Sequence, residues 1–237
     1  MRLVPQRSNR PEIMDRADNA TVDLRAALGD IRRTNRWLGG RRALFSALRP
    51  FLLSGSGPLE ILDVGTGGAD LPKEMLRFGL RLGRELRVTA IDREPRTARI
   101  AASEAAGCPR VRVLCADAWR LPFADRSFDL VTASLFLHHF GHDEIVQLLG
   151  KFRRLARRAV LVNDLHRHLV PWAFIYFVSR LTLRHPMYVH DAPLSVLRGF
   201  TPAELSRAAR ETGASPIRLR RRWPFRLALT VPALVDP

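Results

Sequence analysis

The stretch ILDVGTGGAD, residues 61–70, decides the fold of this chain. Its apolar residues predict a buried strand with Asp63 near the end, and the glycines that follow predict a turn with almost no side chains. Such glycines let the backbone turn tightly and let a ligand approach the amides at the start of the next helix. The stretch therefore predicts a strand over 59–65, a ligand-binding turn and a helix over 70–82.

The same alternation of strand and helix patterns continues through the middle of the chain. Near-continuous apolar runs separated by amphipathic segments indicate βαβ units and a parallel sheet covered on both faces. The predicted strands span 59–65, 86–92, 111–117, 128–135 and 157–164, the helices between them span 70–82, 94–106 and 142–156, and a last strand pair is expected within 215–232. The fold class is therefore α/β, with a doubly wound, mostly parallel, seven-stranded sheet.

The segments that flank this core follow other patterns. Residues 1–20 indicate a loose arm, although its PEIMD stretch holds an apolar pair that could dock on the body. The apolar spacing over 23–53 predicts two amphipathic helices broken at Gly39-Gly40. The stretch LVPWAFIYFVSRLTL, residues 169–183, is too short to span a bilayer and too apolar for an exposed helix. We expect it to form a small apolar cap, a dimer face or a wall for an apolar ligand.

A further helix is predicted after the apolar stretch. Thr201 is suited to its N-cap, Pro202 to its first position and Glu204 to the closing of a capping box. The organisation that we expect is an N-terminal arm and helices (1–57), the α/β core that binds the ligand (58–164), a cap or substrate-side insertion (165–200), and a C-terminal helix and strands that complete the sheet (201–237).

Charge and cysteine content narrow the classes of function. The formal net charge is +16, nearly all of it from arginine, which fits a compositional bias better than an anionic membrane surface or a nucleic-acid partner. Cys108 and Cys115 have neither disulfide-framework nor metal-ligand spacing, so we predict no metal site. The charged N-terminus lacks the apolar core of a secretory signal, and a cytoplasmic location is the expectation.

The turn after the first strand does not suit a phosphate. Counting from Gly65, Asp70 stands where a G-x-G-x-x-G fingerprint would have its last glycine, and the sequence has no P-loop motif. Asp63 and Asp70 suit instead a ligand that carries an ammonium or a sulfonium. Asp92 ends the second strand, where a ribose diol would find an acceptor, and Asp117 ends the third, where a carboxylate can accept from an adenine amino group.

Three segments in this order resemble the class I S-adenosylmethionine-dependent methyltransferases over about residues 58–164: ILDVGTGGAD, VTAID and VLCADAWRLPFADRSFDLVTASLFLHHF. The part ADAWRLPFADRSFDLVTASLFLHHF is similar to the ubiquinone/menaquinone-biosynthesis group, methyltransferase type 11. Ala69 departs from the family where many members carry a third glycine, at a small expected cost. The resemblance implies the Rossmann-like methyltransferase fold and S-adenosyl-L-methionine as cofactor.

The resemblance also implies roles for individual residues. Asp63 and the glycines would hold the methionine moiety, Asp92 the ribose hydroxyls and Asp117 the adenine, while Ser134 or Leu135 would lie on the sulfonium side. The cofactor-binding residues predicted in this way are Asp63, Gly65, Thr66, Gly67, Asp92, Arg93, Asp117, Ala118 and Ser134.

Methyl transfer from a sulfonium needs proximity and orientation, and a base where the nucleophile carries a proton. His138 and His139 follow the fourth strand on the cofactor side of the sheet, so one of them is a candidate catalytic base. Because adjacent side chains diverge, we expect at most one of them to face the pocket, and a purely structural role is equally open. The substrate-side candidates are Asn163, Asp164, Trp172, Tyr176 and His190, the last with Asp191 as an orienting partner.

The leading hypothesis is methyl transfer to a small hydrophobic acceptor: a phenol, a quinol or a polyketide-derived aromatic, with O-methylation favoured over C-methylation. Methylation of a base nitrogen is disfavoured, because the fifth strand leads into VNDLH (162–166) and not into N-P-P-[YF]. The alternatives are an RNA methyltransferase, motivated by the charge, and a non-catalytic protein that keeps the fold for partner binding. Nucleic acid is not the expected partner, while a peripheral membrane contact and the choice between monomer and homodimer stay open.

Overall fold

The computed structural model describes residues 4–13, 23–182 and 186–234. The remaining parts of the predicted arm and the last residue of the predicted apolar stretch, Leu183, lie outside the described residues.

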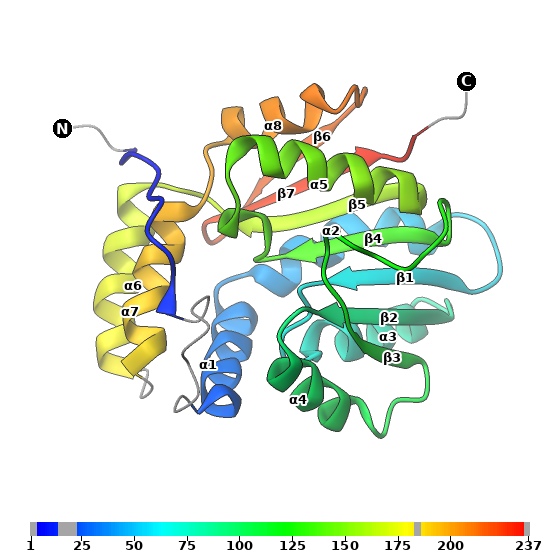
Figure 1. Cartoon of the computed structure of the whole chain (residues 1–237), viewed down its shortest axis with the longest axis horizontal. Helices are drawn as coiled ribbons and strands as arrows, with labels where there is room; N and C mark the ends of the chain where they lie inside the picture. The colour runs from blue at the N-terminus through cyan, green and yellow to red at the C-terminus, as the bar shows by residue number, and fades with distance from the viewer. Residues whose placement is uncertain (1–3, 14–22, 183–185, 235–237) are drawn as a thin grey trace.

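One seven-stranded sheet runs through the molecule in the order β3-β2-β1-β4-β5-β7-β6 (Figure 1). Its strands are β1 (Leu59–Val64), β2 (Leu86–Asp92), β3 (Val111–Cys115), β4 (Phe128–Ser134), β5 (Ala156–Leu165), β6 (Arg218–Arg222) and β7 (Arg226–Pro232). Neighbours among β1 to β5 are parallel, and β7 runs antiparallel to both β5 and β6. The predicted sheet is confirmed, and its strand order reverses between β1 and β4, where α/β proteins bind ligands.

Helices cover both faces of this sheet. They are α1 (Leu24–Trp37), α2 (Gly40–Leu53), α3 (Asp70–Arg81), α4 (Pro95–Ala105), α5 (His142–Leu155), α6 (Leu169–Thr182), α7 (Pro186–Arg198) and α8 (Pro202–Glu211), with a short 3-10 turn, η3 (Leu137–His139). Leu48 of α2 and Met75 of α3 are buried against one face, and Phe152 of α5 and Leu205 of α8 against the other. Each such side chain contributes roughly 1.5–3 kcal/mol to folding.

The helices predicted from the sequence are confirmed, including the break at Gly39. The capping box of α8 is formed as predicted: the Glu204 N–H donates to Thr201 Oγ1 at 3.2 Å, and the Thr201 N–H donates to Glu204 Oε2 at 2.8 Å. Sequence analysis missed α7 and η3. α7 carries Pro193 in its interior, and an internal proline argues against a helix when only the sequence is available.

The helices α1, α6 and α7 gather at the carboxyl edge of the parallel strands (Figure 1). Ile175 of α6 packs against Ala192 and Val196 of α7, and Trp172 and Leu38 lie against this cluster. The apolar stretch therefore forms a helical cap beside the predicted ligand-binding turn.

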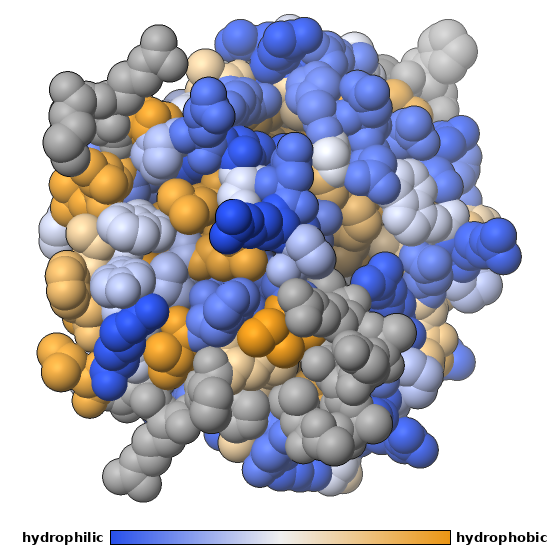
Figure 2. Space-filling view, turned by 60° about the vertical axis from the view of Figure 1, so that its left-hand side comes forward, coloured by the Kyte–Doolittle hydropathy of each residue, from blue (hydrophilic) through white to orange (hydrophobic). Residues whose placement is uncertain are grey.

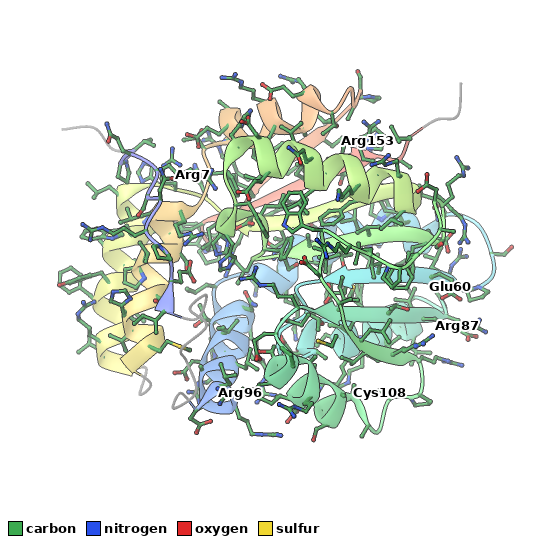
Figure 3. The ribbon with its side chains drawn as sticks, in the orientation of Figure 1. Arg7, Glu60, Arg87, Arg96, Cys108 and Arg153 are labelled. Carbon is green, nitrogen blue, oxygen red and sulfur yellow. The ribbon has the colours of Figure 1, made fainter. Side chains whose placement is uncertain are left out.

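The described part of the N-terminal arm, residues 4–13, is bound to the body, contrary to the prediction of a loose arm. The Ser8 N–H donates to the Leu197 carbonyl at 3.1 Å, and Arg7, labelled in Figure 3, donates to the carbonyls of Arg198 and Phe140, both at 2.9 Å. Main-chain hydrogen bonds and charged side chains therefore dock the arm. Composition alone did not indicate them.

Candidate active site

A cavity of about 1040 Å³ opens at the carboxyl edge of β1, β2 and β4. Its walls come from the glycine turn, the strand ends, η3, α1, α7 and the N-terminal arm. The structure places every cofactor-binding residue predicted from the sequence in these walls: Asp63, Gly65, Thr66, Gly67, Asp92, Arg93, Asp117, Ala118 and Ser134. Their gathering in one cavity agrees with the prediction, while their individual roles stay predictions.

The turn after β1 depends on glycine at two positions. Gly65 has φ +68°, and a Cβ atom there would lie 2.5 Å from Cδ2 of the Phe136 ring, while Gly67 has φ +56°. Ala69 is also left-handed, with φ +53°, and it is the N-cap of α3. Alanine therefore carries a strain here that the sequence did not indicate, because a left-handed conformation strains any residue with a Cβ.

Two carboxyl groups flank this turn in a poorly solvated position. Asp63 is 2% exposed, and Thr132 Oγ1 donates to its Oδ1 at 2.6 Å. Burial raises the pKa of Asp63 to about 6, and burial likewise raises the pKa of Asp70 to about 6. A cationic ligand beside either group would favour its charged form.

Asp92 joins the turn to the end of β2. Its Oδ2 accepts from the Gly67 N–H at 3.0 Å and its Oδ1 from the Glu94 N–H at 3.1 Å, and burial raises its pKa. The carboxylate is therefore fixed by two main-chain donors. Each oxygen keeps a lone pair that could accept from a ligand hydroxyl.

Asp117, which follows β3, and Ser134, at the end of β4, make fewer hydrogen bonds than Asp92 does. Asp117 Oδ1 accepts from the Trp119 N–H at 2.9 Å, and the side chain lies in the cavity wall. Ser134 Oγ, at the end of β4, is buried and has no hydrogen-bond partner among the described residues. A buried hydroxyl without a partner is costly, and a polar ligand group in the cavity would satisfy it.

His138 lies on the other side of the cavity, between two carboxylates. Its Nδ1 is 2.7 Å from Asp164 Oδ1, its Nε2 is 3.5 Å from Glu12 Oε1, and its side chain is 3% exposed. Burial lowers the pKa of His138, but Asp164 and Glu12 raise it further, to about 9. The imidazole is therefore a cation at neutral pH, so the prediction that His138 is a base does not fit.

His139 lies beside it in the same wall. The two ring centroids are 4.2 Å apart, and both residues line the cavity. The expectation that at most one of them faces the pocket was therefore wrong, because the tight η3 turn brings the adjacent rings together.

The substrate-side residues predicted from the sequence do not line the cavity. Asp164 lies behind the wall and holds His138, and Asn163 is fully buried in β5, paired in register with Ser134. Trp172 and Tyr176 contact each other within the cap, with ring centroids 5.3 Å apart. His190 does pair with Asp191 at 2.9 Å, but its side chain is 55% exposed and only Asp191 reaches the cavity wall.

Sequence analysis missed the groups that hold the histidines. Arg198 at the end of α7 donates to the carbonyls of His138 (3.1 Å) and His139 (2.8 Å), and Ser195 Oγ donates to Glu12 Oε1 at 2.8 Å. These residues come from the arm, η3 and α7. No local motif connects such distant positions, so the sequence carries no signal that could have found them.

The positive charge is spread over the molecule. Arg7, Arg87, Arg96 and Arg153 lie on different sides of it in Figure 3. Some arginines are buried and bind main-chain carbonyls, as Arg153 does with the Pro232 carbonyl at 2.8 Å. This distribution fits the interpretation of the charge as compositional. In the described part of the chain, no helix has the length and apolar character needed to cross a membrane.

A ligand cavity at the switch point of this seven-stranded sheet, with carboxylates at the ends of β1 and β2 and shortly after β3, defines the class I methyltransferase fold. Residues 61–159 match the family model described as a methyltransferase domain. This match confirms the prediction of an S-adenosylmethionine-dependent methyltransferase domain over the α/β core of the chain. The similarity to the ubiquinone/menaquinone-biosynthesis group stays a prediction.

Solved structures share the fold at low sequence identity. The plantazolicin methyltransferase BpumL in complex with SAH superposes with a TM-score of 0.64 at 14% identity, over 93% of this chain and 92% of that one. A SAM-dependent methyltransferase from Aquifex aeolicus gives 0.58 at 16% identity, over 87% and 98%. A putative O-methyltransferase from Nostoc punctiforme gives 0.61 at 17% identity, over 94% and 64%. The curated proteins contain no match to this chain.

Proposed function

We propose that the protein transfers a methyl group from S-adenosylmethionine to a small apolar acceptor that binds beside it in the same cavity. The observation that carries this proposal is that the cavity has two chemically different ends. One end holds the glycine turn and the carboxylates, and the other is walled by Phe136, Phe174, Ile175 and Phe225. We infer a phenol, a quinol or a polyketide-derived aromatic as acceptor, with methylation on oxygen favoured over carbon.

The polar end suits the parts of S-adenosylmethionine in order. Asp63 would pair with the ammonium, Asp92 would accept from the ribose hydroxyls, and Asp117 would accept from the adenine amino group. The unsatisfied Ser134 hydroxyl would lie on the sulfonium side. When bound, the cofactor supplies an electrophilic methyl group directed toward the apolar end.

The size of the cavity favours a small acceptor over a polymer. Ligand pockets usually measure about 300–1,000 Å³, so this cavity, at about 1040 Å³, has room for the cofactor and one compact second molecule. Apolar walls would orient an aromatic ring by shape and would exclude water from the reacting atoms.

The two histidines would have different roles in this reaction. His138, held as a cation by Asp164 and Glu12, would position the neighbouring ring of His139. His139 would orient the acceptor and assist the loss of its proton. The acceptor oxygen then forms its bond to the methyl carbon as the sulfur–carbon bond breaks, which leaves S-adenosylhomocysteine.

An exposed apolar stripe beside the cap supports a lipophilic acceptor. Val170, Phe174, Phe177 and Leu181 lie at helical spacing on one side of α6, and Leu181 is 83% exposed. Figure 2, which brings this end of the molecule forward, shows apolar surface among hydrophilic groups. We infer that the stripe contacts a lipid surface, from which a lipophilic acceptor would reach the cavity. Cosedimentation with vesicles should decrease in Phe177→Ser, and it should occur with neutral as well as anionic vesicles.

Calorimetric titration with S-adenosylmethionine and S-adenosylhomocysteine, followed by a product screen on phenols and quinols, tests the proposed function. We expect one site of micromolar affinity and methylated products that carry the label of the cofactor methyl group. Absence of cofactor binding would favour the non-catalytic alternative. Salt-dependent RNA binding together with RNA methylation would favour the RNA methyltransferase alternative.

A further inference from the structure

Three potential metal ligands converge in the cavity wall: Glu12, His138 and His139. One ligand atom of each lies within 4.8 Å of those of the other two, and Glu12 Oε1 is 3.5 Å from His138 Nε2. Glu12 comes from the N-terminal arm and the histidines from η3, which directly follows β4. The cluster is therefore built by the fold and lies beside the predicted sulfonium side of the cofactor site.

A second carboxylate orients His138 in the way that metal-bound histidines are oriented. Asp164 Oδ1 lies 2.7 Å from His138 Nδ1, and Asp164 is fully buried. With Nδ1–H donating a hydrogen bond to that carboxylate, the neutral His138 ring directs the lone pair of Nε2 toward Glu12. A carboxylate, a histidine and a metal in line form a recurrent arrangement in which the outer carboxylate fixes the ring.

The distances are compatible with a small ion. Nitrogen and oxygen ligands lie about 2.1 Å from Zn²⁺, so two ligands of a tetrahedral site are about 3.4 Å apart. Glu12 and His138 already have nearly this separation. His139 is half-buried, and its ligand nitrogen lies within 4.8 Å of the other two ligand atoms. A rotation of its ring would bring this nitrogen within coordination distance of the same ion.

Two carboxylates and one guanidinium group surround the cluster. Glu12 and Asp164 each contribute a negative charge, and Arg198 Nε lies 4.0 Å from Glu12 Oε1. The two carboxylates together offset the two positive charges of a divalent ion.

We propose that Glu12, His138 and His139 bind one divalent transition-metal ion at the acceptor end of the cavity. Two imidazoles and one carboxylate are a donor set that suits Zn²⁺, Co²⁺ and Fe²⁺, whereas Mg²⁺ and Ca²⁺ prefer oxygen ligands. Because His139 and His138 line the cavity, at least one coordination position would face the acceptor.

The role of the ion in the reaction rests on the proposed function, whereas its binding does not. A hydroxyl oxygen bound to the ion would lose its proton to solvent more easily, because the ion stabilises the oxyanion. That oxygen would then form its bond to the methyl carbon while the sulfur–carbon bond breaks. As a ligand, His139 would assist the loss of the proton only through the ion and would not itself take the proton, and the site would select acceptors that carry a hydroxyl.

Metal titration of the full chain tests this inference. The protein would be purified without a histidine tag, stripped with a chelator and titrated with Zn²⁺ by calorimetry, and Co²⁺ binding would be followed by visible absorption. All samples, the reference protein included, would carry Cys108→Ser and Cys115→Ser. These substitutions remove thiol binding at Cys108 and at the exposed Cys115. We expect one equivalent to bind, with the Co²⁺ spectrum of a site that has nitrogen and oxygen ligands.

Two variants and one matched control locate the site. Glu12→Gln and His139→Ala should each weaken Zn²⁺ binding at least tenfold, and thermal unfolding would verify that both fold. His142→Ala disrupts a surface pair, His142 Nε2 to Glu211 Oε2 at 2.6 Å, and should change the affinity less than twofold. Absence of saturable binding of either ion, or equal affinity in wild type and both variants, would overturn the inference.

Cofactor titration of the same samples separates this inference from the proposed function. Metal binding without S-adenosylmethionine binding would overturn the proposed function and leave the metal site standing. Cofactor binding without metal binding would support the proposed function and overturn the metal site.

Discussion

The two ends of the cavity are built in different ways. The cofactor end uses residues at the ends of consecutive strands, such as Asp63 and Asp92, which the pattern of each strand places independently. The acceptor end is assembled from Glu12 of the arm, His138 of η3 and Arg198 of α7, which meet only in the folded chain. The comparison indicates that the cofactor end tolerates little change in the turn, while the acceptor end depends on contacts between distant segments.

Asp92→Ala should have the largest effect, a loss of cofactor affinity. The substitution would remove the proposed acceptor for two ribose hydroxyls, and it removes the partner of the Gly67 N–H. Hydrogen bonds to charged groups contribute about 1.5–3 kcal/mol each, so we expect the affinity for S-adenosylhomocysteine to fall about 10³-fold. Calorimetry measures this directly.

Asp129→Ala is a control for the loss of a half-buried strand carboxylate. Asp129 Oδ2 accepts from the Glu60 N–H at 2.8 Å, and Asp129 is not among the residues that line the cavity. Cofactor affinity should change less than about twofold. An equal loss in both variants would mean that Asp92 acts only through stability.

The sequence predicted the cofactor end well because its information is local. The switch from apolar runs to helical periodicity placed β1 and β2, and Gly65 and Asp92 follow from their positions at the strand ends. The acceptor end could not be predicted in this way. Glu12 lies in an arm with no periodic pattern, and Asp164 was predicted as a substrate-side group and not as the partner of His138. Only the packing of the arm, η3 and β5 shows that both contact His138.

His139→Ala should have the next largest effect and should separate the two ends. We expect turnover to fall about 10²-fold, which is typical for loss of a group that assists proton transfer, with the cofactor affinity unchanged within about twofold. Steady-state rates and calorimetry on the same sample measure the two quantities. His190→Ala should change turnover far less, since the His190 ring is exposed and outside the cavity wall. A comparable loss in His190→Ala would restore that residue as a substrate-side group.

The affinity for the cofactor should depend on pH because the pKa of Asp63 is raised. Above a pKa of about 6 the carboxyl group is ionised and would attract the ammonium of the cofactor as proposed, and below it the group is neutral and that attraction would be lost. At pH 5 about a tenth of Asp63 is ionised, so the affinity for S-adenosylmethionine should be about tenfold weaker than at pH 7.5. Calorimetry across this range measures the change.

Asp70 provides the comparison for this pH dependence, because burial raises its pKa to about 6 as well. The pH dependence should disappear in Asp63→Asn and persist in Asp70→Asn. The opposite result would assign the contact with the ammonium to Asp70.

The smallest expected change, that of Ala69→Gly, concerns the stability of the turn after β1, where Ala69 and Gly65 both have a left-handed backbone but differ in their neighbours. Ala69 is strained by its φ of +53°, and Ala69→Gly should raise the free energy of unfolding by about 0.5 kcal/mol, since relief of the strain exceeds the entropy that glycine adds to the unfolded chain. Gly65→Ala should lower it by about 2 kcal/mol or more, because its Cβ would lie 2.5 Å from the Phe136 ring and would add overpacking to the strain. Urea unfolding of both variants measures the two signs. A loss of stability in Ala69→Gly would mean that the alanine methyl group, buried in this turn, contributes more through packing than it costs through strain.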